Sequence, residues 1–148
     1  MKFEVDQSGR IEETNRLTVI SIASKDYSYT VKIDSKIKRV IQKKFQKIGK
    51  PKMFGVYGFT TGLIILLKLS KVKNSVVVID IEYDGYNKVI SNELTKNTKQ
   101  NLEFRFTNIG KKSPAHKTAY AVFKKRSKQD YKIDLDEFDK LVMKMIRV

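Results

Sequence analysis

The first quarter of the chain alternates between hydrophobic and polar residues, which predicts β structure. β-branched residues dominate positions 17–23, and positions 27–33 alternate with the period of two that is typical of a half-buried strand. Ser8 and Gly9 favour a two-residue hairpin turn, so we expect the second strand to start at Arg10. These residues therefore predict a three-stranded antiparallel meander.

The hydrophobic period changes to that of a helix beyond these strands. Apolar residues recur at helical spacing from Ile37 to Ile48, and Gly49 with Pro51 ends the segment. Residues 53–57 are typical of a short strand. Residues 60–69 are almost continuously apolar, which fits either a buried helix or a buried strand, and we favour the helix.

Strands and helices alternate in the second half of the chain. Residues 76–81 form a continuous run of branched apolar side chains, as in a central strand that is covered on both faces and parallel to its neighbours. The elements expected after it are a helix at about 85–94, a strand at 102–106, a helix from Ser113 and Pro114 to about Lys125, and a final helix over 134–146.

Length and pattern together predict one domain over residues 1–148. A chain of 148 residues has the usual size of a single domain and can bury a core. We expect an α/β fold, in which three leading antiparallel strands and the following alternation of helices and strands form a mixed sheet with helices on its faces. The helix at 134–146 is expected to be an appendage to this domain.

Charge is the strongest feature of the composition. The chain has 31 Lys and Arg against 16 Asp and Glu, a net charge of +15, and nucleic acid is the commonest anionic partner of such a surface. Residues 35–52 and 105–128 each carry eight basic residues and no acid, whereas solvated helix faces normally mix both signs. The residues predicted to contact nucleic acid are Ser8, Arg10, Lys36, Arg39, Lys43, Lys47, Lys111, Lys112 and Ser113.

The cysteine count and the first residues of the chain bear on the cellular compartment. The chain has no cysteine, which excludes disulfides and thiolate metal sites and fits a reducing compartment. The first ten residues lack the apolar core of a signal peptide, and the longest apolar stretch, near 62–69, is too short to span a bilayer. We therefore expect a soluble cytoplasmic protein with no membrane partner.

Acidic residues gather at two predicted strand ends in this basic chain. Asp6 ends the first strand, and Asp80, Glu82 and Asp84 end the central one. Residues two apart on a strand share a face, so Asp80 and Glu82 point together, and Asp6 joins them if the two strands are neighbours. Clustered carboxylates repel unless cations lie between them, and Mg²⁺ or Mn²⁺ prefers such oxygen ligands. Ordinary solvent-facing strand-end acids are the alternative.

His116, the sole histidine, falls in the first turn of the helix that Ser113 begins. The positive end of a helix dipole disfavours imidazolium, which keeps a neutral ring available to bind metal or to carry a proton. The preceding loop, residues 108–113, combines a glycine, two lysines and free amides, which indicates a phosphate-binding site. A lone histidine is also frequent as an ordinary surface residue.

The arrangement resembles the ribonuclease H-like superfamily, which includes ribonucleases H and Holliday-junction resolvases. The resemblance rests on Asp6 before a glycine turn, three leading strands, Asp80 with Glu82 at a central strand, and His116 on a late helix. It implies two-metal hydrolysis of phosphodiester bonds, in which these four residues are catalytic and bind Mg²⁺ or Mn²⁺. Ribonucleases H also carry a glutamate on the first helix, which this chain lacks, so Glu82, or Glu12 or Glu13 on the second strand, would have to replace it.

The leading functional hypothesis is a metal-dependent nuclease that acts on structured DNA or on an RNA-containing duplex. A resolvase-like enzyme would act as a homodimer, because it needs two sites. Two alternatives stay open: a non-catalytic nucleic-acid-binding module, and a component of a ribonucleoprotein that uses the same basic face.

Overall fold

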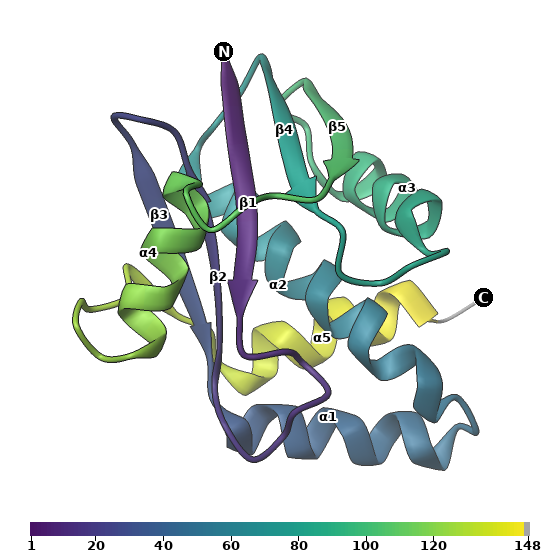
Figure 1. The fold of residues 1–148 in the computed structure, drawn as a ribbon. Helices are drawn as coiled ribbons and strands as arrows, with labels where there is room; N and C mark the ends of the chain where they lie inside the picture. The colour runs from purple at the N-terminus through teal and green to yellow at the C-terminus, as the bar shows by residue number, and fades with distance from the viewer. Residues whose placement is uncertain (147–148) are drawn as a thin grey trace.

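The computed structural model describes residues 1–146 as a three-layer α/β fold with a six-stranded mixed sheet (Figure 1). The strands are β1 (Lys2–Ser8), β2 (Thr18–Ala23), β3 (Ser28–Ile33), β4 (Ser75–Asp80), β5 (Leu102–Thr107) and β6 (Tyr131–Lys132). The helices are α1 (Ser35–Lys47), the 3-10 turn η1 (Pro51–Met53), α2 (Phe54–Ser70), α3 (Asn87–Asn97), α4 (Pro114–Phe123) and α5 (Leu135–Ile146).

The strand order in the sheet is β5-β4-β1-β2-β3-β6. β2 is antiparallel to β1 and β3, whereas β4 is parallel to β1 and β5, and β6 is parallel to β3. β1 therefore lies at the centre, between the antiparallel meander and the parallel half. The expected α/β fold with a mixed sheet is confirmed.

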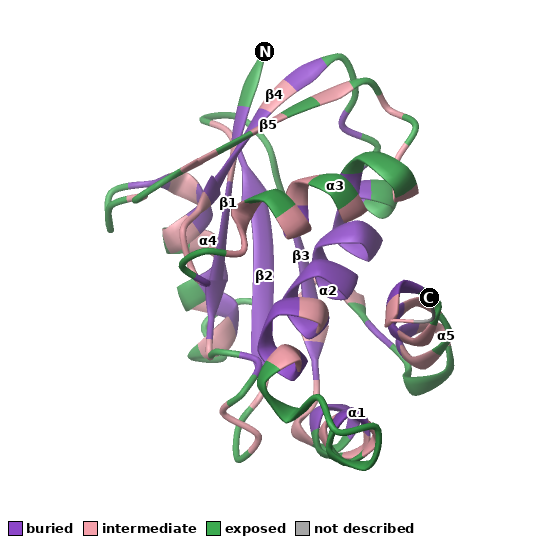
Figure 2. Ribbon diagram, turned by 90° about the vertical axis from the view of Figure 1, so that its right-hand side faces the viewer, coloured by how far each residue is buried: buried purple, intermediate pink, exposed green. Residues whose placement is uncertain are grey.

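Helices cover the two faces of the sheet unequally (Figure 2). α4 packs alone against β1, β2 and β3 on one face, and α2 is the central helix of the other face, where it also contacts α1, α3 and α5. A close approach of α2 to the sheet requires Gly62, because a Cβ there would lie 2.7 Å from Ile20 Cδ1 and 3.0 Å from Ile33 Cδ1. The main core lies between α2 and the sheet.

Most predicted elements are confirmed, with four corrections. β2 begins at Thr18 rather than Arg10, so β1 and β2 are joined by a loop of residues 9–17 instead of a two-residue turn. The expected short strand at 53–57 is wrong, because these residues belong to η1 and α2. The two-residue strand β6 was not predicted, since Tyr131 and Lys132 are too short a segment to show a period.

The fourth correction concerns α5, which was expected to be an appendage. The capping box is present: Glu137 N donates to Asp134 Oδ1 at 2.9 Å, and Asp134 N donates to Glu137 Oε2 at 3.0 Å. However, Phe138, Val142 and Met145 of α5 are buried in the main core. The helix is therefore an integral part of the domain.

The helical segment Pro51–Ser70 is long and apolar enough to cross a membrane by length and composition alone, with a mean hydropathy of 1.5. The expectation that the longest apolar stretch is too short for this used residues 62–69 only and is corrected by the longer helix. Within the fold, 72% of the apolar window is buried, as is usual for a central core helix.

Candidate metal centre

The candidate site lies where the carboxyl ends of β1 and β4 meet. Val5 pairs with Ile79 in the parallel register, so Asp6 and Asp80 occupy the next positions of adjacent strands. Val5 and Ile79 are buried in the core on the α2 side, and because side chains alternate along a strand, Asp6 and Asp80 point to the opposite face, toward α4. The expected acidic cluster depended on the condition that these two strands are neighbours, and this condition is met.

Three carboxylates converge at this point. One oxygen each from Asp6, Asp80 and Glu82 lies within 4.8 Å of the other two. Asp6 is 5% exposed, and Asp80 and Glu82 are partly buried, so this is not a set of acids directed into open solvent. Asp84, two residues further along, is exposed and lies outside the cluster. The donor set consists of hard carboxylate oxygens, which fits Mg²⁺ or Mn²⁺ better than a soft transition metal.

Hydrogen bonds fix the orientation of two of the acids. Asp6 Oδ1 accepts from the Gln7 backbone N–H at 2.8 Å, and Asp6 Oδ2 lies 2.9 Å from His116 Nδ1. Asp80 Oδ1 accepts from the Ile109 backbone N–H at 2.7 Å. The second oxygen of Asp80 is then available to the centre of the cluster, which is how carboxylate ligands are commonly held.

The pKa values of all three acids are raised. Burial raises the pKa of Asp6, against the opposing effect of its bond to His116, and the Asp80 charge adds to the rise. Burial also raises the pKa of Asp80. Burial, followed by the charges of Asp80 and Asp6, raises the pKa of Glu82 to about 8. The raised pKa values mean that the three carboxylates are costly to ionise together. A cation bound between them would offset this repulsion.

Comparison of the chain with protein-family models, curated proteins and solved structures gives no match. The geometry of the carboxylates is therefore the observation that supports a site here.

His116 lies beside the carboxylates rather than among them. Its Nδ1 pairs with Asp6, and its ring stacks on Tyr120 at a centroid distance of 6.1 Å. If the ring is neutral, Nδ1–H donates to Asp6 and Nε2 keeps its lone pair. The position on the first turn of α4 follows from Ser113, whose Oγ accepts from the Ala115 N–H at 3.1 Å, as the sequence predicted.

The predicted phosphate-binding loop at 108–113 is partly used by the protein itself. The Ile109 N–H is bound to Asp80, and the Ser113 hydroxyl donates to Glu4 Oε1 at 2.8 Å while it caps α4. These two groups are therefore occupied, which corrects the expectation that the amides and Ser113 are free. Lys111 and Lys112 of the same loop remain exposed.

The other predicted nucleic-acid contacts fall into two groups. Ser8 is buried at the end of β1, and Arg10 is held by Glu12 at 2.9 Å and by the Glu82 carbonyl oxygen at 2.7 Å. The remaining four lie on α1, which belongs to the face of the sheet opposite α4. Lys36, Lys43 and Lys47 are exposed there, and the Arg39 Nη1 donates to the Thr14 carbonyl oxygen.

Residues 10–17 were expected to belong to the second strand, but they form part of loop 9–17, which lies beside the site. Glu12 Oε1 accepts from the Tyr83 hydroxyl at 3.1 Å and Glu12 Oε2 from Arg10, so Glu12 lies in the loop and not on β2. Glu12 and Glu13 are outside the three-carboxylate cluster. Gly9 has φ +75°, and a Cβ on it would lie 2.3 Å from Leu17 O, so the loop can start only with glycine.

Lys38 is a residue that the sequence analysis missed. It is fully buried, and its Nζ donates to Arg10 O at 3.0 Å, to Glu13 O at 2.8 Å and to Thr18 Oγ1 at 2.9 Å. The ammonium group thereby has three acceptors for its three N–H bonds. Lys38 lies on the same face of α1 as the buried residues Ile37 and Ile41, which is a weak sequence signal of burial. The neighbouring exposed lysines made this signal hard to recognise.

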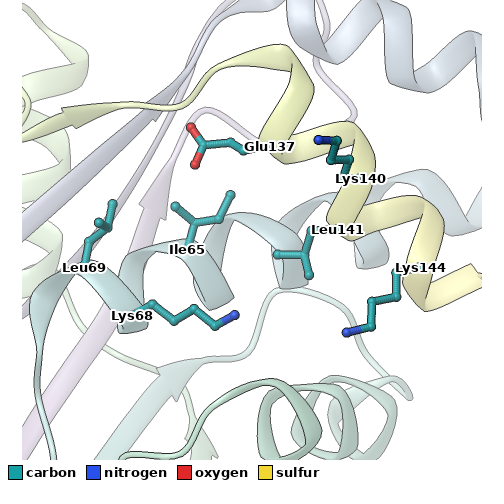
Figure 3. Close-up of a pocket in the computed structure, with 7 residues that line it drawn as sticks. All are labelled: Ile65, Lys68, Leu69, Glu137, Lys140, Leu141 and Lys144. Atoms are coloured by element: carbon teal, nitrogen blue, oxygen red, sulfur yellow. The ribbon is translucent and has the colours of Figure 1, made fainter.

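A second hollow in the molecule lies away from the carboxylates. It has a volume of about 390 Å³ between α2 and α5 and is lined by three apolar side chains, by Glu137, and by the three lysines Lys68, Lys140 and Lys144 (Figure 3). α2 and α5 lie on the face opposite α4, so this pocket is separated from the acidic cluster by the sheet.

The raised pKa of Glu82 predicts an unusual pH dependence of stability in the absence of metal. Between about pH 4.5 and pH 8 the folded protein retains a proton on Glu82 that the unfolded chain loses, so stability falls as the pH rises through this window. The substitution Glu82→Gln removes this ionisation. It should stabilise the protein by roughly 1–3 kcal/mol at about pH 9, after allowance for solvent screening, and change little at about pH 5.

Urea unfolding in EDTA at the two pH values measures this difference. Asp84→Asn is the matched control, because Asp84 is exposed and outside the cluster. Equal responses of the two variants at both pH values would show that Glu82 ionises like an ordinary surface acid.

Proposed function

We propose that this protein is a divalent-metal-dependent nuclease. The observation that carries the proposal is the convergence of Asp6, Asp80 and Glu82 at the ends of two adjacent parallel strands in a chain of net charge +15. A cluster of acids is costly beside a phosphate polyanion unless cations lie between them. The proposed ligands are these three carboxylates, and the proposed cofactor is Mg²⁺ or Mn²⁺.

The strand order also supports the proposed relation to the ribonuclease H-like superfamily. β1 carries the first acid, is antiparallel to β2 and parallel to β4, and β4 carries the second acid. When bound, one or two divalent ions would supply Lewis acidity and positive charge for an in-line attack of water on a phosphodiester. The family assignment remains part of the proposal.

The protein's own side chains have distinct proposed roles. Asp6, Asp80 and Glu82 hold the metal, and the backbone N–H groups of Gln7 and Ile109 orient the two aspartates. His116 fixes the orientation of Asp6 through Nδ1, which leaves Nε2 as the group that exchanges a proton with solvent or substrate. Glu82, whose pKa is raised to about 8, retains a proton at neutral pH that it would have to lose in order to bind a metal.

The test is cleavage of labelled branched DNA and of an RNA–DNA hybrid. We expect cleavage with Mg²⁺ or Mn²⁺ and none in EDTA. At sub-saturating metal the rate should rise with pH, because the metal competes with the proton that Glu82 retains in the metal-free protein. Isothermal titration should show heat from Mg²⁺ binding without nucleic acid. Absence of both metal binding and cleavage would contradict the proposal and favour the non-catalytic binding module.

A further inference from the structure

Six cations line two adjoining hollows at the C-terminal end of α4. The hollows, of about 530 Å³ and 400 Å³, share Leu17 and Lys125 in their walls. We call them together the basic cleft, whose cationic lining residues are Arg16, Lys32, Lys36, Lys125, Arg126 and Lys128. Its apolar floor includes Leu17, Val122 and Phe123.

The cleft joins the two basic segments of the sequence. Lys36 comes from the start of α1 and Lys125 from the end of α4, although these helices belong to opposite faces of the sheet. They meet where β2 begins and β3 ends, at the Thr18–Ile33 pair. The tertiary structure therefore concentrates cations that are about ninety residues apart in sequence.

Few acids balance this charge. Asp34 is the acidic residue in the cleft lining of the described chain, and it is already paired with Lys132 at 3.0 Å and Lys32 at 3.7 Å. Arg16 has a partner in Glu13 at 3.0 Å. No ion pair within residues 1–146 involves Lys36, Lys125, Arg126 or Lys128. The surplus positive charge lacks a partner inside the fold.

The segment that presents these cations is held in one conformation. At the end of α4, Lys125 N donates to Val122 O at 3.0 Å, and the N–H groups of Arg126 and Ser127 both donate to Ala121 O. Lys125 itself has φ +60°, the left-handed conformation of a helix C-terminus. The Arg16 guanidinium lies over the Phe123 ring at 5.2 Å. Pre-organised cations bind a polyanion with a smaller loss of entropy.

The cleft lies at the C-terminal end of α4, and His116 near the other end of this helix pairs with Asp6 of the carboxylate site. Phe123 in its floor touches Gly9, where a Cβ would lie 2.7 Å from Phe123 Cε1, and Gly9 follows Asp6 by three residues. His116 and Phe123 are on the same ten-residue helix, one near each end, so the helix links the two places over a distance of about 10 Å. A nucleic-acid strand with one phosphate at the carboxylates can reach the cleft with its neighbouring phosphates.

We infer that the basic cleft is a second substrate-binding site, which binds the sugar–phosphate backbone of nucleic acid away from the phosphodiester bond that is cleaved. The inference rests on the proposed function for the identity of the substrate. It assigns to Lys125, Arg126 and Lys128 the affinity for substrate, and leaves catalysis to the acids.

Lys125→Gly tests this without damage to the fold. Glycine is the preferred residue at a left-handed helix end, so the variant should melt at the same temperature as the wild type or higher. Binding of a labelled DNA duplex of about 20 base pairs, in EDTA, is measured by fluorescence anisotropy at several salt concentrations. We expect affinity to fall about five- to tenfold and the slope of log K against log salt to decrease by about 0.9, as for one lost phosphate contact.

Lys71→Gly is a matched control. Lys71 is also an exposed lysine with φ +60° at a helix C-terminus and also lies in a hollow with other lysines, but it precedes β4, whereas the carboxylates lie at the opposite end of that strand. We expect its affinity for the duplex to change less than about twofold. Equal losses in the two variants would indicate unspecific attraction to net charge, and no loss in Lys125→Gly would remove the cleft from the interface. Either result overturns the inference.

A triple variant, Lys125→Gly with Arg126→Gln and Lys128→Gln, extends the test. The salt slope should decrease by about two to three, and the affinity should fall by at least about a hundredfold. Because binding is measured in EDTA, the result does not depend on cleavage. A protein that binds through the cleft but never cleaves would refute the proposed function alone, and one that cleaves but binds equally well without these cations would refute the cleft alone.

Discussion

Replacement of Asp80 by asparagine is expected to reduce Mg²⁺-dependent cleavage by about a thousandfold, equivalent to about 4 kcal/mol of transition-state stabilisation. The variant keeps an oxygen that accepts from the Ile109 N–H, so the loop at 108–113 stays in place. What it loses is the charge that the proposed metal requires. Single-turnover cleavage of the substrate, with saturating protein, measures the chemical step without interference from product release.

The same substitution should not weaken the fold. Asp80 raises the pKa values of Asp6 and Glu82 by repulsion, so its neutralisation relieves two unfavourable interactions in the metal-free protein. We expect Asp80→Asn to melt at the wild-type temperature or above in EDTA, and to lose the stabilisation that Mg²⁺ gives the wild type. A stable but inactive variant is the expected signature of a functional site that costs stability.

Asp84→Asn is the control for this experiment as well. It removes the same charge from the same stretch of chain, but from an exposed side chain outside the carboxylate cluster. Cleavage should change less than about threefold, as for other surface substitutions. Comparable activity of Asp80→Asn and Asp84→Asn would show that the carboxylate cluster does not carry the chemistry.

Lys38→Met is expected to produce the largest loss of stability, roughly 2–4 kcal/mol, which corresponds to a fall of about 5–15 °C in Tm. Methionine fills a similar volume but cannot donate to Arg10 O, Glu13 O and Thr18 Oγ1, three acceptors that would then lack a partner in a buried setting. Burial lowers the pKa of Lys38 to about 8, so the group is still charged at neutral pH and its hydrogen bonds are charge-assisted.

The matched control is Lys44→Met on the same helix. Lys44 pairs with Asp139 at 2.7 Å, but its side chain is 41% exposed, and partly exposed ion pairs contribute at most about 1 kcal/mol. Thermal melts of the two variants under identical conditions separate the effects. If both lose the same small amount, the Lys38 ammonium does not stabilise loop 9–17.

Lys38 also connects stability to the site. The loop that it holds carries Arg10, whose Nη2 donates to the Glu82 carbonyl oxygen, and Glu12, which accepts from Tyr83. Release of the loop should therefore disturb the position of Glu82 more than that of Asp6 or Asp80, which are held by β1, β4 and their own hydrogen bonds. The loop belongs to the framework of the candidate metal centre.

The candidate metal centre could be predicted from sequence because strand periodicity is local. The branched run before Asp80 indicated a central strand that lies beside others, and Asp80 is its last residue, whereas Glu82 lies two residues beyond the end of β4. Ser113 and Pro114 fixed the start of α4 and so the position of His116. Each of these inferences depends on neighbours within a few residues.

The sequence could not predict how the basic residues are distributed. Lys38 belongs to a run of lysines that looks uniformly solvated, yet its side chain is buried because loop 9–17 closes over it. The loop itself was missed, since a serine–glycine pair favours a tight turn locally, whereas the pairing of Ser8 with Val19 requires a longer connection. Long-range pairing overrode the local preference.

The sequence by itself determined the α/β class, the helix starts, and the position of the acids at strand ends, because periodicity and capping act between residues close in the chain. Only the tertiary structure decided that Asp6 reaches Asp80 and Glu82, that α5 completes the core, and that Lys36 and Lys125 line one cleft. These contacts depend on strand order and on the packing of helices against the sheet. Both are selected by burial of the whole apolar surface and not by any single segment.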